Sequence, residues 1–421
     1  MKSLDVYLDE RLVGTLSRST GGLCFSYSVE YLGLPAPLPL SRHLPIETGL
    51  PPQIFEDQAS RAFFENLLPE GDVRSQVARN LGVSRENTFE LLAALGGDCA
   101  GAVSLLPPGE KQRRTGHYRP ISRDNLAEEL DRLPSHPFLA DEEGVRLSLA
   151  GAQNKLPIYY DGNEFYVPEE GAPSTHIIKT PIKNLENTVV NEAFCMDLAA
   201  QVGLNVPRTD VVELGGSQYF LIERYDRQTT LAGRIERLHQ EDFCQALGIP
   251  PAEKYEKEGG PGFGACFGLL RAWSSEPFPD VAALLQWALF NFLIGNADAH
   301  GKNISFLYAG GQVRLAPLYD LISTAVYQRQ VNNKFAMKFG GEKDPRYLLT
   351  RHLNQFADDA GIGYRAVKVA LQNMAKDLKR IAPVLADEYR ERFAAPVIVN
   401  RLVEIIEQRV AKAEFLLSGK Q

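Results

Sequence analysis

The pattern of apolar and polar positions divides the chain into strand-rich and helix-rich stretches. Near the N-terminus, short runs rich in Val, Leu, Tyr and Phe lie between turn-forming residues, which predicts an antiparallel meander. Helical spacing follows, and then a further strand and a polar, glycine-containing stretch typical of a linker. The strands are expected over residues 3–9, 12–17, 23–29 and 101–106, the helices over 59–68, 73–81 and 88–95, and the linker over 107–120.

A second sheet is predicted after the linker, with one major helix over residues 189–202. Its strands are expected over residues 145–149, 155–160, 164–168, 175–180, 209–214 and 218–224. Beyond residue 231 the chain is mostly helical, and its last seventy residues repeat an i, i+3, i+4 apolar spacing. This order predicts an α+β, protein-kinase-like fold with a sheet-rich lobe before a helical lobe.

Three domains are expected in a chain of 421 residues. They are a small N-terminal α+β subdomain over residues 1–115, the sheet-rich lobe over 116–230 and the helical lobe over 231–421.

Composition narrows the class of protein. Five scattered cysteines without a C-x-x-C pair argue against a disulfide framework and a cysteine zinc site, and they suit a reducing cytoplasm. Neither a signal-like N-terminus nor an uninterrupted run of 18 apolar residues is found, which argues against secretion and membrane spanning. A net charge of -8, with one short basic run at residues 111–114, lacks the footprint of a chain that binds nucleic acid by itself.

The stretch Asn-Ala-Asp-Ala-His-Gly-Lys-Asn at residues 296–303 places an acid and an amide at the spacing of the D-x-x-x-x-N catalytic loop of kinases. Asp298 would be the base and Asn303 a metal ligand. Asp320 follows after a short strand pair and would be the second metal ligand, an oxygen set that suits Mg²⁺. Asp298 and His300 also leave a zinc site open, although no third ligand stands at a suitable spacing.

Three further segments fit a nucleotide site, each with a structural alternative. The small residues within 148–155 allow backbone N–H groups to approach phosphate oxygens, or form only a tight hairpin. Lys179 ends a strand, where it would pair with phosphates and with Glu192 on the next helix, or would be a solvated strand tip. Residues 221–227 would be the adenine hinge, or a charged edge strand.

With these pieces in order, the chain resembles the HipA family, the serine/threonine-kinase toxins of type II toxin–antitoxin pairs. The resemblance spans most of the chain. The matching segments are residues 14–18, 64–71, 148–155, 175–181, 223–227, 240–245, 254–262, 298–303 and 318–323. One departure is Asn154, where the family loop usually has Glu before its lysine.

The resemblance implies a role for each matching residue. Asp298 would be the catalytic base, Asn303 and Asp320 would bind Mg²⁺, and Ser148 would be the autophosphorylated serine whose modification shuts the kinase off, because a phosphate adds negative charge beside a loop that receives ATP phosphates. The implied ATP contacts are Ala150, Gly151, Ala152, Gln153, Asn154, Lys155, Lys179, Glu223, Arg224, Tyr225, His300, Gly301, Lys302, Asn303, Tyr319 and Asp320.

The resemblance also implies partners. A helix-turn-helix antitoxin would carry the chain to operator DNA. The substrate would be a cellular protein, and the known substrates of the family include aminoacyl-tRNA synthetases. Two other functions stay open: a nucleotide-binding co-repressor with vestigial catalysis, and a small-molecule kinase on the same scaffold, although no further acidic cluster near Asp298 marks an acceptor pocket.

Overall fold

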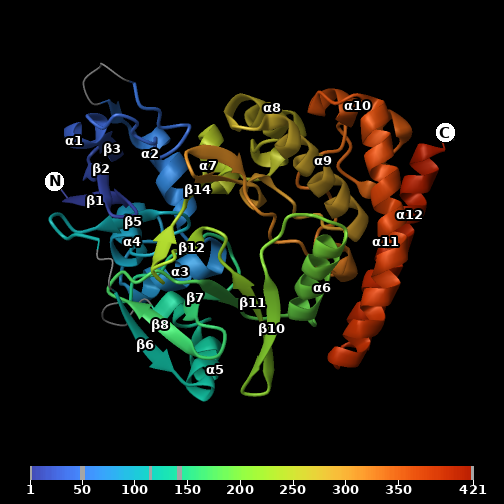
Figure 1. The fold of residues 1–421 in the computed structure, drawn as a ribbon, viewed down its shortest axis with the longest axis horizontal. Coiled ribbons are helices and arrows are strands. Elements are labelled where there is room, and N and C mark those ends of the chain that lie inside the picture. Colours follow the sequence, from blue (N-terminus) through green and yellow to red (C-terminus); the bar gives the residue numbers. More distant parts are fainter. Residues whose placement is uncertain (1, 48–52, 113–115, 140–144, 419–421) are drawn as a thin grey trace. The chain divides into compact units, whose positions relative to one another are not determined.

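A computed structural model describes residues 2–47, 53–112, 116–139 and 145–418 and shows an α+β protein (Figure 1). The chain forms two compact units. One comprises Met1–Thr180, Val212–Ala252 and Leu307–Gly311, and the other comprises Pro181–Val211, Glu253–Phe306 and Gln312–Gln421. The three domains expected from the sequence, with boundaries at residues 115 and 230, stay a prediction. Arg113 and Arg114 of the short basic run lie outside the described residues.

The first unit begins with an antiparallel sheet in the order β4-β3-β2-β1-β5. The predicted meander is confirmed, because β1, β2 and β3 pair in sequence. Apolar residues alternate along β3, and Phe25 packs with Phe64 of α2 at a ring distance of 5.4 Å. The elements are β1 (Lys2–Leu8), β2 (Arg11–Ser19), β3 (Gly22–Tyr27), α1 (Val29–Leu32), β4 (Ile54–Phe55), α2 (Asp57–Phe64), α3 (Gly71–Asn80), α4 (Thr88–Leu95) and β5 (Val103–Leu106).

A six-stranded sheet follows in the order β10-β11-β9-β7-β8-β6. Its inner strand β9 pairs antiparallel with both β7 and β11, which makes Lys179 a central residue rather than a tip. The elements are β6 (His117–Ile121), α5 (Arg123–Arg132), β7 (Lys155–Tyr160), β8 (Phe165–Glu169), β9 (His176–Lys179), β10 (Thr209–Leu214) and β11 (Ser217–Glu223).

Two expectations for this region were wrong, and one helix was missed. The end of the predicted linker is strand β6, which tolerates Pro120 because an edge strand leaves backbone groups unpaired. Residues 145–149 form no strand, since the segment makes only an isolated bridge between Leu147 and Asp98. The helix α5 was not foreseen. Its composition is mostly charged, and it is fixed by the Ser122 cap and the buried Leu126 and Leu130.

Three small strands and a hairpin complete the strand content. The hairpin consists of β12 (Arg227–Thr229) and β13 (Ile235–Arg237), and the small sheet has the order β14 (His239–Asp242), β15 (Ser305–Ala309), β16 (Gln312–Leu315). The short helix α7 (Phe243–Leu247) follows β14 and begins with a capping box. The Asp242 side chain accepts from the Gln245 N–H, and the Gln245 side chain accepts from the Asp242 N–H.

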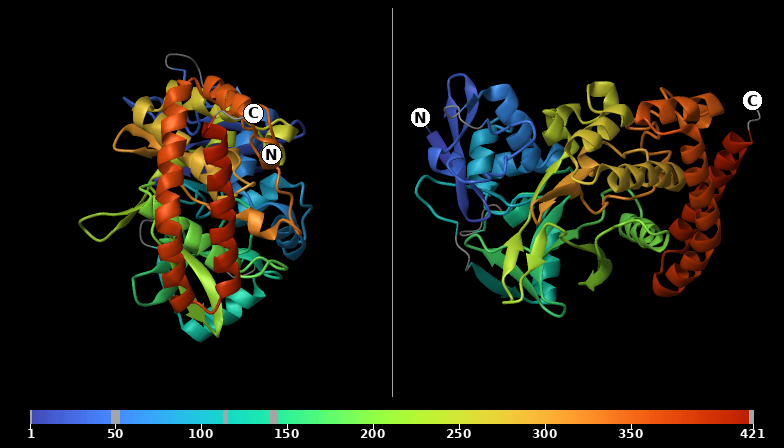
Figure 2. Two further views of the ribbon diagram at one scale, coloured as in Figure 1. Left: turned by 90° about the vertical axis from the view of Figure 1, so that its right-hand side faces the viewer. Right: turned by 45° about the horizontal axis from the view of Figure 1, so that its top comes forward.

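The second unit is mainly helical, as predicted. Its helices are α6 (Thr188–Gln201), α8 (Phe263–Trp273), α9 (Pro277–Ile294), α10 (Thr350–Ala360), α11 (Tyr364–Arg392) and α12 (Pro396–Leu417). The long helices α11 and α12 lie side by side (Figure 2). Helix α9 has the length and hydropathy of a membrane span, but 61% of it is buried inside the protein, as in the core helix of a globular unit.

A buried carboxyl group joins three segments of the first unit. Glu241 on β14 is fully buried and accepts hydrogen bonds from the Ser41 hydroxyl at 2.6 Å, from the Arg42 N–H at 3.1 Å and from the Tyr308 hydroxyl. Burial raises the pKa of Glu241 to about 7, although these donors favour the charged form. The matching segment at residues 240–245 therefore has a structural role.

We predict that Glu241→Gln changes how stability depends on pH. The pKa of Glu241 is higher in the folded protein than in the unfolded chain, so protonation of Glu241 favours folding. This contribution to the free energy of unfolding is complete below about pH 4.5 and is lost as the pH rises towards about 7. Glutamine does not titrate. The free energy of unfolding of the variant should therefore rise relative to wild type by up to about 3 kcal/mol between these pH values. Urea unfolding at several pH values measures this free energy. Glu128→Gln, at an exposed position, is the control with the same change of charge. If the free energy of unfolding depended on pH in the same way in wild type and in Glu241→Gln, the prediction would be contradicted.

Candidate active site

The predicted catalytic loop begins where α9 ends. Gly295 takes the left-handed conformation with φ of 72°, and a Cβ there would lie 2.7 Å from Ala325, so only glycine fits. The Asn296 side chain then donates to the Asn291 side chain at 2.7 Å and accepts from the Asp298 N–H at 3.0 Å. These bonds fix the backbone turn that presents Asp298, which is exposed.

The two predicted metal ligands lie side by side. Asn303 Nδ2 donates to Asp320 Oδ2 at 3.1 Å, and Asn303 Oδ1 accepts from the His300 N–H at 3.0 Å. Asp320 has a φ of 57°, a left-handed conformation that is uncommon outside glycine and is often found at functional sites. Mg²⁺ takes a few oxygen ligands and completes its shell with water and phosphate. Because the Asn303 amide nitrogen faces the Asp320 carboxylate here, the Asn303 side chain would have to turn for its amide oxygen to join Asp320 as a Mg²⁺ ligand.

The segment around Asp320 is supported by Asn191, which the sequence did not single out, and by Tyr319, which it did. The Asn191 side chain on α6 accepts from the Ser323 N–H and donates to the Ser323 carbonyl, each at 3.0 Å. The Tyr319 hydroxyl donates to the Lys302 carbonyl at 2.8 Å and contacts the Ser305 hydroxyl at 2.7 Å. Tyr319 thus joins the Asp320 segment to the catalytic loop through its side chain.

Asp298 also has a partner that sequence reasoning missed. The Tyr255 hydroxyl donates to Asp298 Oδ1 at 2.8 Å, and its ring meets the His300 ring edge to face at 5.3 Å. Tyr255 belongs to the segment 254–262, which was noted for its resemblance to the HipA family but was given no role. Among the described residues, no group of three or more His, Cys, Asp or Glu side chains could hold a metal ion, so the zinc alternative finds no support.

The predicted phosphate loop lies in the first unit. Gly151 has a φ of 110°, and its carbonyl accepts from the Glu70 N–H at 2.9 Å. The Lys155 ammonium donates to the Ala150 carbonyl at 2.6 Å, and the Gln153 side chain donates to the Thr180 carbonyl at 2.7 Å. The loop is therefore held by bonds at both ends and is not a tight hairpin between two strands.

Ser148, at the start of this loop, is fully buried. Its hydroxyl donates to the Leu67 carbonyl at 2.8 Å, and its N–H donates to the Asp98 carbonyl at 3.2 Å. A hydroxyl in this position has no access to a phosphate donor, so any phosphorylation of Ser148 requires the loop to leave the arrangement seen in this structure.

Lys179 is 5% exposed, and its ammonium lies 5.7 Å from the Phe220 ring centroid. Lys179 is therefore a buried residue of an inner strand, and its contact with the nucleotide phosphates stays a prediction. Glu192 is buried on α6 in the other unit, and its pairing with Lys179 stays a prediction.

The predicted hinge follows β11. The Arg224 N–H donates to the Thr175 carbonyl at 2.9 Å, and the Tyr225 hydroxyl donates to the Gln240 side chain. Glu223 is exposed. The main-chain contact with adenine stays a prediction, and the Arg224 side chain is turned into the protein.

A buried charge network holds that side chain. Arg224 bonds to Asp226 at 2.8 Å and to Asp98 at 3.3 Å, while Arg227 reaches Asp98 at 2.7 Å and Arg237 reaches it at 3.2 Å. Burial alone would raise the pKa of the Asp98 carboxyl, but the three arginines together hold it below its usual range. The network fixes the hinge to the N-terminal residues.

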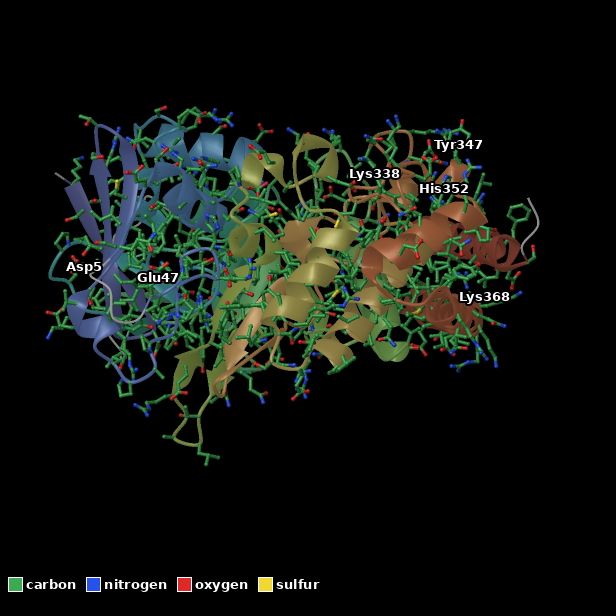
Figure 3. The ribbon with its side chains drawn as sticks, turned by 90° about the horizontal axis from the view of Figure 1, so that it is seen from above. Asp5, Glu47, Lys338, Tyr347, His352 and Lys368 are labelled. Atoms are coloured by element: carbon green, nitrogen blue, oxygen red, sulfur yellow. The ribbon has the colours of Figure 1, made fainter. Side chains whose placement is uncertain are left out.

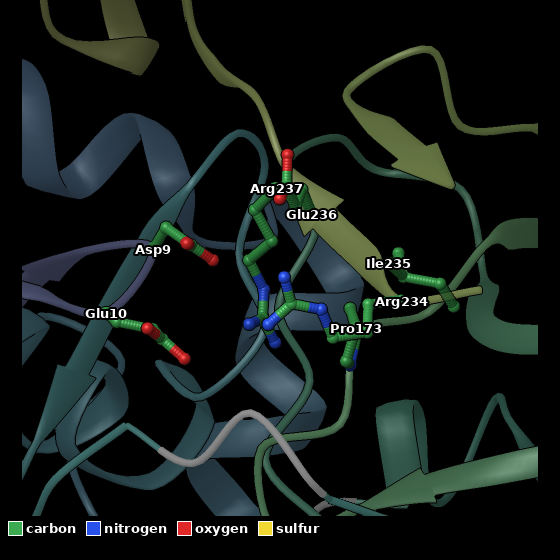
Figure 4. Close-up of a pocket in the computed structure, with 7 residues that line it drawn as sticks. All are labelled: Asp9, Glu10, Pro173, Arg234, Ile235, Glu236 and Arg237. Carbon is green, nitrogen blue, oxygen red and sulfur yellow. The ribbon is translucent and has the colours of Figure 1, made fainter. Parts of the chain in front are cut away.

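Arg237 also lines a small pocket together with Asp9, Glu10, Pro173 and residues 234–236 (Figure 4). Asp9 and Glu10 face Arg234 and Arg237 across it. The pocket contains none of the predicted site residues. Within each unit the structure groups those residues as follows: Ser148, residues 150–155, Lys179 and residues 223–225 in the first, and Asp298, residues 300–303, Tyr319 and Asp320 in the second.

Comparisons with known proteins show the family and the fold of the chain. The model of the HipA N-terminal domain matches residues 4–106, and that of the HipA-like C-terminal domain matches residues 147–382. The chain is 42% identical over 394 residues to the protein Y4mE of Sinorhizobium fredii, covering 92% of this chain and 93% of that protein. It is 34% identical over 397 residues to the serine/threonine-protein kinase toxin HipA of Shewanella oneidensis, covering 91% of this chain and 89% of the toxin.

A solved structure matches as well. The complex of Shewanella oneidensis HipA with HipB and operator DNA contains a chain with a TM-score of 0.83 and 31% identity, covering 99% of this chain and 97% of that one. These findings confirm both the resemblance drawn from the motifs and the expected fold class.

We predict that Asp98→Ala destabilises the protein by about 3–5 kcal/mol, because it leaves Arg224 and Arg227 with Asp226 as their carboxylate partner and removes the carboxylate that Arg237 contacts. Chemical unfolding followed by circular dichroism measures the loss. Asp124→Ala in the first turn of α5 is the control, with an expected cost below about 1 kcal/mol. If both variants lost the same free energy of unfolding, the buried charge network would contribute no more to stability than an exposed aspartate.

Proposed function

This chain belongs to the HipA family, and we propose that it is the kinase toxin of a type II toxin–antitoxin pair. In this proposal it transfers the γ-phosphate of ATP to a serine or threonine hydroxyl of a cellular protein and so arrests growth. The observation that carries the proposal is the joint arrangement of an exposed Asp298 and the adjacent Asn303 and Asp320 on one ordered loop system.

Asp298 would act as the base. As the acceptor oxygen forms its bond to the γ-phosphorus, the bond from that phosphorus to the bridging oxygen breaks, and ADP leaves with the electron pair. The proton of the acceptor hydroxyl passes to the Asp298 carboxylate. Exposure of Asp298 gives an acceptor access, and the fixed backbone turn holds the carboxylate where a positioned base is most effective.

Asn303 and Asp320 would hold Mg²⁺, which neutralises charge on the nucleotide phosphates when bound. Residues 150–155 and Lys179 would contact the phosphates, and the main chain of residues 223–225 would contact adenine. His300, Gly301, Lys302 and Tyr319 would complete the nucleotide contacts. The buried Arg224 side chain makes its contribution structural, through the network that fixes the hinge.

We further propose that the protein acts in the cytoplasm and binds a HipB-like helix-turn-helix antitoxin that carries it to operator DNA. Support comes from the solved complex of the Shewanella oneidensis protein and from the net charge of -8, which does not favour direct DNA binding by this chain. A co-repressor with vestigial catalysis is the second candidate, and the same variant separates the two.

Asp298→Ala should reduce phosphate incorporation from labelled ATP by about a hundredfold or more, because a positioned general base contributes at least that much. It should also relieve growth arrest while leaving antitoxin binding intact. Asp387→Ala on the exposed face of α11 is the matched control. Equal incorporation by wild type and Asp298→Ala would sink the kinase proposal. A wild type that represses its operator but transfers no phosphate would favour the co-repressor.

Ser148→Ala should abolish autophosphorylation and prolong kinase activity, because the phosphate that would switch the loop has no attachment site. Its folding cost should be only about 1 kcal/mol, the value of the lost bond to Leu67. Phosphopeptide mass spectrometry and a time course of substrate phosphorylation measure both effects, with Ser75→Ala as the control. A phosphate found on another residue of the wild type would contradict the assignment.

A further inference from the structure

The segment 254–262 has no task in the proposed reaction, yet it is fastened to the catalytic loop. The Ala336 N–H donates to the Ala297 carbonyl at 2.9 Å, and the Glu256 N–H donates to the Ala336 carbonyl at 3.2 Å. Ala336 thus bridges the residue before Asp298 to the residue after Tyr255.

The Glu256 side chain strengthens this attachment. Its carboxylate accepts from the Lys338 N–H at 2.6 Å and pairs with the Lys338 ammonium at 3.2 Å. Lys338 is labelled in Figure 3. Backbone and side-chain bonds on both sides of residue 336 therefore hold the segment in register with the loop that carries Asp298.

Tyr255 is the residue that this attachment delivers to Asp298. Its hydroxyl donates to Asp298 Oδ1 at 2.8 Å, and its ring rests on the edge of His300. The ammonium groups of Lys254 and Lys257 lie 5.3 and 5.6 Å from the ring centroid. The ring is thus steadied by an aromatic contact and two cations, while its hydroxyl reaches the carboxylate.

We propose that Tyr255 is a positioning residue of the kinase, which orients the Asp298 carboxylate and keeps it in the charged form that accepts a proton. This inference rests on the proposed function and adds a residue to it. An exposed aspartate has two free side-chain torsions, and a donor fixed to the same loop removes that freedom. A hydrogen bond donated to a carboxylate also stabilises the ionised form.

Tyr255 does not transfer a proton in this reaction. The proton leaves the acceptor hydroxyl and arrives on Asp298, while the phenol keeps its hydrogen throughout. Loss of the hydroxyl should leave the base in place but less well oriented and ionised only at higher pH, and nucleotide binding should not change.

Tyr255→Phe tests the inference, because it removes one oxygen and keeps the ring against His300. Initial rates of phosphate transfer are measured against ATP concentration and against pH. We expect kcat to fall about tenfold or more, KM for ATP to stay within about twofold, and the acidic limb of the pH profile to move upward by about one pH unit.

Tyr347→Phe is the matched control, since Tyr347 is 64% exposed and lies at the periphery of the protein (Figure 3). Thermal unfolding of both variants separates a positioning effect from loss of fold, and it should be close to wild type in each. A Tyr255→Phe protein with wild-type kcat and pH profile, or with a raised kcat, would overturn the inference and leave the proposed function intact. A wild type without phosphate transfer would instead overturn the proposed function itself.

Discussion

The end of α9 is the constraint on which the catalytic loop depends. A helix must leave its last carbonyl groups without intrahelical donors, and here the backbone N–H groups of the left-handed Gly295 and of Asn296 donate to those carbonyls as the chain turns. The same turn sets the direction of Asp298. Every later contact of the loop, with Tyr255 on one side and Asp320 on the other, builds on a backbone whose course is already decided at that glycine.

In both units, networks of hydrogen bonds or ion pairs satisfy buried polar side chains. In the second unit, amides do this work, as with Asn191 around Ser323 and Asn303 against Asp320. Amides carry no net charge and so cost less to bury than ions. In the first unit the network around Asp98 is ionic, and it is stable only because each charge meets opposite charges and further donors.

The sequence predicted well where a short pattern decides the structure. In the β-meander, buried and less buried positions alternate throughout β3, and the bounds of α4 were predicted to the residue. The strand β6 and the helix α5 were missed because their side chains are largely polar and their place is set by tertiary pairing. The acid and amide of the catalytic loop could be proposed from their spacing together with Lys179 and Asp320, and their roles stay predictions. Tyr255 and Asn191 could not, because their contacts join positions 43 and 132 residues apart.

The charge network has a consequence for how relatives of this chain can diverge. Asp98 lies within the segment matched by the N-terminal family model, whereas its arginine partners lie within the segment matched by the C-terminal model. Neither segment can change its share of the buried charge alone without leaving an uncompensated ion. The two family segments must therefore evolve together at these positions, and chimaeras that exchange the first hundred residues between distant members should be viable only when both halves inherit a matching set of charges.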